Sequence, residues 1–311
     1  MLLKKLYIIF LLILTPLNKT LSLENKILFF IDNQIVTSLD VLNELQYLKV
    51  VNLNLSELDR NTSIEVAKNS LISEIIKKNE ILKYTDSIVV DDVYLEETLK
   101  KIYKNIGFET IDEFDNYLKK SDVNLIKIKE KISIEIFWKE LIYTKFSNQV
   151  VINREEIEKD LKKLQNKLTN EYLLSELIFN IQNAGKLDSK LELIKGDILK
   201  KGFKNATLIH SIADSAKKNN GQIGWINEAS INQNIRKIIK DLAVGEHTDP
   251  ISIPGGYLIL KIDDLRKVKN DKINLNDEIN KIVFNKTNEQ LNNFSNIYFN
   301  KIKKEFSISE K

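Results

Sequence analysis

The 311-residue sequence contains no cysteine, and this absence excludes several classes of protein. Without cysteine there is no disulfide framework, no thiolate zinc site and no cysteine nucleophile. Histidine is almost as scarce, because His210 and His247 are the only two and they are far apart in the chain. A histidine metal site or a Ser-His-Asp triad needs a histidine held beside specific partners. We therefore expect neither a metal nor another cofactor.

A basic excess is also missing once the first residues are set aside. Lys4, Lys5 and Lys19 lie in residues 1–22, which contain no acidic residue, and they account for the whole formal net charge of +3. The neutral remainder has none of the basic footprint that nucleic-acid binding requires. It also has no glycine-rich loop of the kind that cradles phosphates. We therefore expect neither nucleic acid nor nucleotide as a partner.

Glycine and proline are few and unevenly placed. Eight of the nine glycines lie between residues 185 and 256, together with Pro250 and Pro254. These two residue types are needed where a chain turns sharply. The distribution therefore predicts a module of tight turns, strands and short helices in this region, between longer helical segments.

The N-terminal segment has the pattern of a secretory signal peptide. Lys4 and Lys5 precede an apolar run over residues 6–14, and Pro16 and small residues follow it. The run is too short for a comfortable membrane span of about 20 residues. We predict a signal peptide over residues 1–22 and export of the rest. The alternative is an uncleaved anchor helix, and only in that case do we expect contact with a membrane.

Helical spacing dominates the sequence up to residue 150. Residues 27–31 and 34–37 predict two strands around a tight turn at Asp32-Asn33. Thr37 with Asp40, and Thr110 with Glu113, then have the spacing of capping boxes that start helices. A long helix is expected after residue 125, and its apolar residues cover a face wide enough to be packed on more than one side.

The turn-rich region predicts strands and helices in a definite order. The expected strands are 172–179, 222–226, 247–253 and 257–263, the last two forming a hairpin through Pro254, Gly255 and Gly256. Apolar spacing predicts helices between the strands: one from Leu187 that ends at Gly202, one capped by Asn205, and one capped by Ser230.

The last part of the chain predicts a linker and one long helix. Residues 267–271 are polar and are expected to be a linker. Apolar residues then recur at helical spacing from Leu275 to Ile302. Because a lone helix has nothing to bury this stripe against, we expect it to dock on the N-terminal helical region.

Several motifs of the turn-rich region resemble the parvulin peptidyl-prolyl isomerase domain. They are Gly221-Gln222-Ile223-Gly224-Trp225, Leu242 with Gly245-Glu246, Pro250, and Gly255-Gly256-Tyr257 followed by Ile259. In addition, Ile31-Asp32-Asn33-Gln34-Ile35-Val36-Thr37 with Asp40-Val41 is similar to the start of the SurA family of periplasmic chaperones. The long-helix region and the final docking helix also fit the plan of that family.

This resemblance implies an α+β fold with two units. One is a largely α-helical chaperone domain made of the N-terminal region and the docked C-terminal helix, and the other is a parvulin-like domain of antiparallel sheet flanked by helices. The expected boundaries are a signal peptide (1–22), the helical domain (23–150), a connecting helix (151–170), the parvulin-like domain (171–266) and the C-terminal helix (267–311).

The resemblance also assigns positions to the parvulin active site. The two histidines of the family fall on Glu176 and Leu258, and its cysteine-or-aspartate position falls on or near Asp214, the only one that matches. The apolar proline pocket falls on Ile231 and Ile235. We expect these two, with Leu258 and Trp225, to contact peptide; for the alternating Leu258, Leu260 and Ile262 an ordinary core role is the alternative.

These positions favour peptide binding over catalysis. We expect a periplasmic, SurA-like chaperone for unfolded exported polypeptides, chiefly outer-membrane β-barrel proteins, whose parvulin domain is weak or inactive as an isomerase. The alternative function is an active peptidyl-prolyl isomerase that assists the folding of exported proteins.

Overall fold

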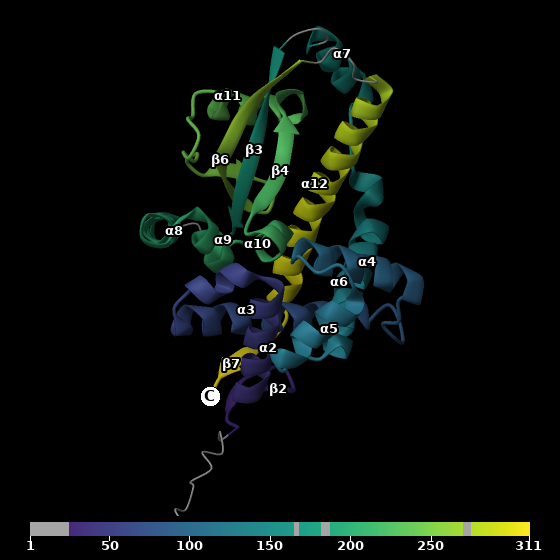
Figure 1. Cartoon of the computed structure of the whole chain (residues 1–311), viewed down its shortest axis with the longest axis vertical. Helices are drawn as coiled ribbons and strands as arrows, with labels where there is room; N and C mark the ends of the chain where they lie inside the picture. The colour runs from purple at the N-terminus through teal and green to yellow at the C-terminus, as the bar shows by residue number, and fades with distance from the viewer. Residues whose placement is uncertain (1–24, 165–167, 182–186, 270–274) are drawn as a thin grey trace, which may run out of the picture.

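The computed structural model of the protein describes residues 25–164, 168–181, 187–269 and 275–311. The predicted signal peptide, residues 1–22, lies outside the described residues. The fold is α+β, as expected: a helical unit and a smaller sheet-containing module lie at opposite ends, and helix α12 passes from one to the other (Figure 1). Among the described residues, every helix is too short or too polar to span a membrane.

A small sheet joins the beginning and the end of the described chain. Strands β1 (Ile27–Ile31) and β2 (Gln34–Thr37) form the predicted antiparallel hairpin. Asp32 makes its turn with a φ of 49°, in the left-handed region that aspartate tolerates. Strand β7 (Ile308–Glu310) pairs with the other edge of β1, which gives the order β2-β1-β7.

The N-terminal unit is built from helices, and local capping signals start most of them. Both predicted capping boxes are confirmed: Thr37 pairs with Asp40 and Thr110 with Glu113, each satisfying N–H groups of a first turn. The helices are α2 (Ser38–Val51), α3 (Arg60–Ile81), α4 (Asp92–Asn105), α5 (Ile111–Lys120) and α6 (Leu125–Phe146).

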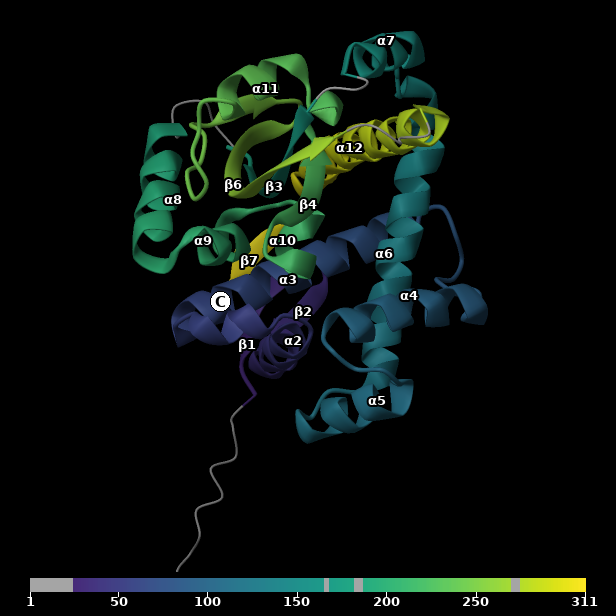
Figure 2. The ribbon, with the colours of Figure 1, turned by 45° about the horizontal axis from the view of Figure 1, so that its top comes forward.

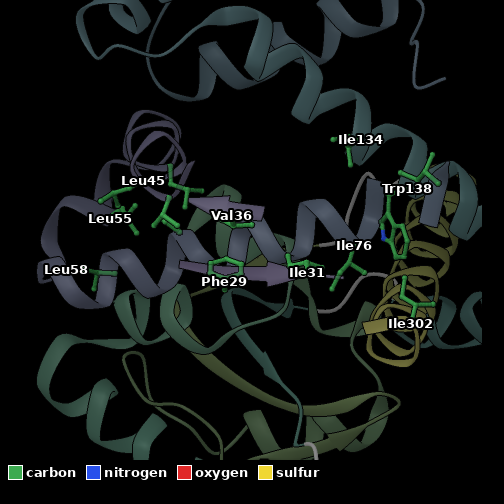
Figure 3. Close-up of a cluster of buried hydrophobic side chains, with 14 of the residues drawn as sticks. Phe29, Ile31, Val36, Leu45, Leu55, Leu58, Ile76, Ile134, Trp138 and Ile302 are labelled. Atoms are coloured by element: carbon green, nitrogen blue, oxygen red, sulfur yellow. The ribbon is translucent and has the colours of Figure 1, made fainter. Parts of the chain in front are cut away.

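Helix α6 is packed on two sides, as its wide apolar face predicts. Ile134 and Trp138 join a core shared with the hairpin, α2, α3 and α12, which Figure 3 shows. Ile128 and Ile132, on the earlier turns, join a second core with α4 and α5. Figure 2 shows α4, α5 and the first turns of α6 set apart from the sheet module.

The predicted docking of the C-terminal helix is confirmed. Helix α12 (Leu275–Lys303) packs with its first half against α7 (Arg154–Leu164) and with its second half against α6. At the second contact, Trp138 Nε1 donates a hydrogen bond of 2.8 Å to Ser295 Oγ, and the indole stacks on Tyr298 with 5.9 Å between ring centroids.

The module is a four-stranded antiparallel sheet in the order β4-β3-β6-β5 with helices on its faces. Its strands are β3 (Leu168–Phe179), β4 (Gln222–Asn227), β5 (Ile251–Ile253) and β6 (Gly256–Lys269). Its helices are α8 (Leu187–Lys201), α9 (Phe203–His210), α10 (Asp214–Asn219) and α11 (Gln233–Ile239).

Two predicted helix caps are wrong. Asn205 lies inside α9, where its side chain donates to the Lys201 carbonyl at 2.9 Å, and Gly202 is the residue before the helix. Asn232, and not Ser230, caps α11, because its Oδ1 accepts from the backbone N–H of Asn234 at 2.9 Å. The N-cap of α9 is thus a glycine that makes no side-chain cap hydrogen bond, whereas α11 has a side-chain cap two residues after the predicted one.

The predicted linker and hairpin also change in length. Residues 267–269 continue β6 instead of starting a linker, because β3 begins at Leu168 and the two strands pair to their ends, with Leu168 opposite Lys269. Residues 270 and 271 lie outside the described residues. The first hairpin strand is shorter than predicted and begins at Ile251, with only an isolated bridge from His247 to Lys261 before it.

Replacing Trp138 tests whether α12 depends on this contact. Trp138 is 2% exposed, so we expect Trp138→Ala to lower the free energy of unfolding by about 3–5 kcal/mol, through lost burial and the cavity that remains. The measurement is urea denaturation followed by far-UV circular dichroism. Trp225→Ala is the matched control, because that half-buried ring lies on the module surface, and it should cost about 1 kcal/mol or less. Equal losses for the two variants would contradict this account of the core.

Candidate functional site

The two faces of the module sheet bury different apolar clusters. Along β6, Leu258, Leu260 and Ile262 point to one face, where they pack with Ile231, Ile239 and their neighbours. Tyr257 and Ile259 alternate to the other face, which α8 and α9 cover. The first face is the one that holds most of the candidate peptide-binding residues.

Three of those candidates come together in the structure. Ile231, Ile235 and Leu258 belong to the same cluster, although they lie on different elements. Leu258 is 8% exposed and stands between Ile178 on β3 and Ile251 on β5 in the sheet register. Leu260 and Ile262 are buried still more deeply. The core alternative therefore holds for Leu260 and Ile262, and Leu258 has little surface left for a peptide.

Glu176 lies on the same face, beside this cluster. By strand alternation its side chain follows that of Leu174 and Ile178, which both belong to the cluster. The half-buried carboxylate accepts a hydrogen bond of 2.7 Å from Ser215 Oγ on α10. Its backbone N–H donates to the Gly221 carbonyl, also at 2.7 Å. The side-chain contact ties β3 to α10 and the backbone contact ties β3 to the start of β4, so Glu176 has a structural role.

Asp214 is the first residue of α10, directly before Ser215. The backbone therefore places it next to the residue that contacts Glu176. Its side chain lies outside the described part of the structure, so its catalytic role stays a prediction.

Trp225 is not part of the cluster. Its neighbour Ile226 packs against the cluster, so Trp225 alternates to the opposite face of β4. There the guanidinium of Arg266 lies 4.1 Å from the ring centroid, in the geometry of a cation–π contact, and also pairs with Glu171 at 2.7 Å. The structure therefore separates Trp225 from Ile231, Ile235 and Leu258.

A polar cluster around Asp263 is not predicted by the sequence. Asp263 is the extra residue of a β-bulge, because Leu173 pairs with Asp264 while Leu174 pairs with Ile262. Burial opposes its charge, but hydrogen bonds from Lys261 and Ser175 outweigh burial and hold the pKa of Asp263 below its usual value. Only the pairing of distant strands creates this bulge, so no local signal reveals it.

Comparisons with known proteins agree with the fold of this module. Residues 181–264 match the family described as "Rotamase: PPIC-type PPIASE domain". The chain is 25% identical over 192 residues to Chaperone SurA of Pseudomonas aeruginosa, a match that covers 58% of this chain and 45% of that protein. It is 26% identical over 216 residues to Foldase protein PrsA of Geobacillus kaustophilus, covering 68% of this chain and 74% of the relative.

Among solved structures, the chain matches one of two structurally related SurA-like chaperones of Campylobacter jejuni, reported as "The virulence factor PEB4 and the periplasmic protein Cj1289". It shares 17% identity, covers 92% of this chain and 99% of its own, and has a TM-score of 0.38. The matched regions span less than half the length of the SurA relatives, at 45% and 44%.

Gly221 tests how strongly the strand contact at Glu176 shapes the site. A Cβ at Gly221 would lie 2.5 Å from the Glu176 carbonyl oxygen and 2.7 Å from Thr207 Cγ2. Gly224 has a similar positive φ, 90° against 86°, but open space around its Cβ position. We expect Gly224→Ala to cost about 1–2 kcal/mol of backbone strain, and Gly221→Ala to cost clearly more because the strands must also separate.

Chemical denaturation of the two variants measures this difference. Equal losses of stability would mean that the approach of β4 to β3 at Glu176 is not a tight constraint.

Proposed function

We propose that this chain, a SurA-like protein with a parvulin-type domain, is an exported chaperone that binds unfolded polypeptides, and that its parvulin domain is weak or inactive as a peptidyl-prolyl isomerase. One observation carries the proposal. The resemblance assigns the position of the second parvulin histidine to Leu258, which is 8% exposed and packed in an apolar cluster.

The chemistry of prolyl isomerisation supports this division of roles. The cis/trans barrier of a peptide bond is about 18–20 kcal/mol. Enzymes lower such barriers with polar groups placed where the electron distribution changes. Leu258 offers no polar group, and Glu176 is engaged by Ser215. The module therefore keeps the frame of a parvulin and lacks the polar arrangement that the frame usually holds.

The helical unit supplies the surface that a chaperone needs. Val89 is 75% exposed and Val93 67% exposed, and the half-exposed Tyr94 follows them at the start of α4. Ile126, at the start of α6, is also exposed. Figure 2 shows α4 and the start of α6 in the part of the molecule that stands away from the sheet module. Exposed apolar residues on this part of the helical unit support binding to other polypeptides.

Export and client choice follow from different observations. The charged and apolar pattern of residues 1–22 supports export to the periplasm. The similarity to proteins named Chaperone SurA supports unfolded polypeptides as clients. We propose outer-membrane β-barrel proteins as these clients, because their chains carry the alternating apolar residues that such a surface holds.

A second candidate function is active prolyl isomerisation, favoured by the retained module and by Ile231 and Ile235 at the proline-pocket positions. In that case the groups that replace the two histidines would include Asp214. Protection of an unfolded client and catalysed exchange of a prolyl peptide separate the two functions.

Charging the exposed apolar residues at the start of α4 should weaken the chaperone. We expect Val89→Asp with Val93→Asp to reduce, several-fold, the protection of an unfolded outer-membrane barrel protein against aggregation, measured by light scattering. The control is Lys100→Gln with Lys101→Gln, which makes the same change in net charge on exposed positions of α4 and leaves the apolar surface intact. Full protection by the Val89/Val93 variant would place the client surface elsewhere.

The isomerase assay addresses the parvulin domain directly. With a proline-containing peptide, we expect cis/trans exchange to be no faster than the uncatalysed reaction, whose time constant is about tens to hundreds of seconds. Leu258→His should lower stability by about 1–3 kcal/mol, because it buries a polar ring among apolar neighbours. A wild-type rate equal to that of active parvulins and abolished by Asp214→Ala would establish the alternative function.

A further inference from the structure

A cleft of about 340 Å³ lies where the helical unit, the parvulin-type module and α12 meet. Its apolar wall includes Leu55 and Val66 from the helical unit, Leu208 and Ile209 from α9, and Phe299 from α12. Apart from Leu55, these side chains are partly buried against the main helical core, and Leu55 belongs to that core. The cleft is therefore a shared feature of three parts of the chain, and it meets the Leu258 cluster of the module sheet at Ile212 and Ala213.

The charged residues of the cleft all have one sign. Lys77, Lys190 and Lys303 line it with His210, and among the described lining residues there is no aspartate or glutamate. The charge of Lys77 is balanced from outside, because Glu135 pairs with its Nζ at 2.8 Å. Lys190 and Lys303 are the two lining cations that form no ion pair with a carboxylate among the described residues, so they can pair with an anionic ligand.

Lys190 contacts a histidine that is itself bonded to an acidic residue. Its Nζ lies 3.1 Å from His210 Nδ1, and His210 Nε2 lies 2.7 Å from an Asp197 carboxylate oxygen. Asp197 also pairs with Lys201 at 3.1 Å. Burial lowers the pKa of His210, which favours the neutral ring, and a neutral ring can accept from Lys190 at Nδ1 while donating to Asp197 at Nε2.

Lys303 has no carboxylate partner within the described residues. Burial lowers its pKa, as it does that of Lys190, where the distant charge of Asp197 opposes the effect only in part. A partly buried cation without a paired anion carries a desolvation cost, and a carboxylate brought beside it offsets that cost. The cleft thus has an apolar wall, and its charged lining residues are lysines with no aspartate or glutamate among the described lining residues.

We propose that this cleft binds an acidic side chain, aspartate or glutamate, of an unfolded client segment, with Lys190 and Lys303 as its cationic partners and the Leu208–Phe299 wall holding the apolar residues beside it. This inference rests on the proposed chaperone function and names a preference in client sequence. It makes the cleft a second contact site, in addition to the exposed surface of α4.

The test uses the full chain and fluorescently labelled, C-terminally amidated peptides of alternating apolar and polar residues. One peptide carries glutamates at its polar positions, and a matched one carries glutamines. We expect the glutamate peptide to bind about tenfold more tightly, a difference of about 1.4 kcal/mol, in fluorescence anisotropy at low ionic strength. The difference should shrink as salt is added.

Single substitutions locate the effect. Lys190→Gln and Lys303→Gln should each reduce the preference for glutamate, whereas Lys200→Gln and Lys301→Gln, on exposed positions of the same two helices, should leave it unchanged. Lys190 also contacts His210, so Lys190→Gln could fail to fold. In that case the comparison of the single variant Lys303→Gln with its control, the single variant Lys301→Gln, decides the question. A preference that survives the Lys303 substitution would overturn the proposal.

Two further outcomes separate this inference from the chaperone function. A glutamine peptide with a free C-terminus that binds as tightly as the glutamate peptide would assign the cleft to chain ends and overturn the side-chain proposal. Equal binding of both amidated peptides, with aggregation still suppressed, would overturn it while the chaperone function stands. If neither peptide binds and aggregation is not suppressed, both fail.

Discussion

The contact between Trp138 and the end of α12 is the interaction on which the rest of the arrangement depends. It joins residues 157 positions apart in sequence through the bond from the indole to Ser295. Stacking on Tyr298 and the neighbouring pair of Phe146 and Phe294, with centroids 5.2 Å apart, extends the contact along the helix. Because α12 begins beside the module and ends in the helical core, this contact fixes the helix that runs between the two units, which also meet directly where Leu208 and Ile209 of α9 pack on the helical core.

The position of α12 also explains why a cleft exists. The helix brings Phe299 and Lys303 to the boundary where α9 of the module meets the main core. Beyond this point β7 pairs with β1, so the chain end is held at both of its last elements. A cleft walled by fixed elements can be selective, because a bound segment does not have to order its walls.

Local signals in the sequence predict the elements better than their ends. Thr37 with Asp40 and Thr110 with Glu113 fix helix starts through contacts only three residues apart, and both predictions are confirmed. The extension of β6 to Lys269 depends on pairing with β3, and local signals do not reveal it. The cap at Asn232 is itself a local contact with Asn234, and the sequence-based prediction places this cap two residues too early. Docking of α12 is predictable because its apolar stripe requires a partner, although the role of Trp138 as that partner is not.

The candidate site shows the same limit. Alternation along β6 is enough to predict that Leu258, Leu260 and Ile262 share one face of the sheet, and this prediction is confirmed. Trp225 is expected to contact peptide together with Ile231, Ile235 and Leu258, yet strand alternation puts its side chain opposite that of Ile226. The cleft brings together Leu55, Lys190 and Phe299 from three distant segments, so no local sequence motif predicts it.

These two regions differ in what they offer an unfolded chain. In the Leu258 cluster the apolar side chains already satisfy one another, so a peptide there would have to displace packed core at a cost of several kcal/mol. At the cleft, the walls are already formed, and Lys190 and Lys303 lack a carboxylate of their own among the described residues. A ligand gains more binding free energy where it pairs with partly buried cations that have no carboxylate partner than where it must displace packed side chains. Under the proposed function, the junction of the two units is therefore the better place for a polypeptide, and the module would contribute to it through α8 and α9 more than through the strand that holds Leu258.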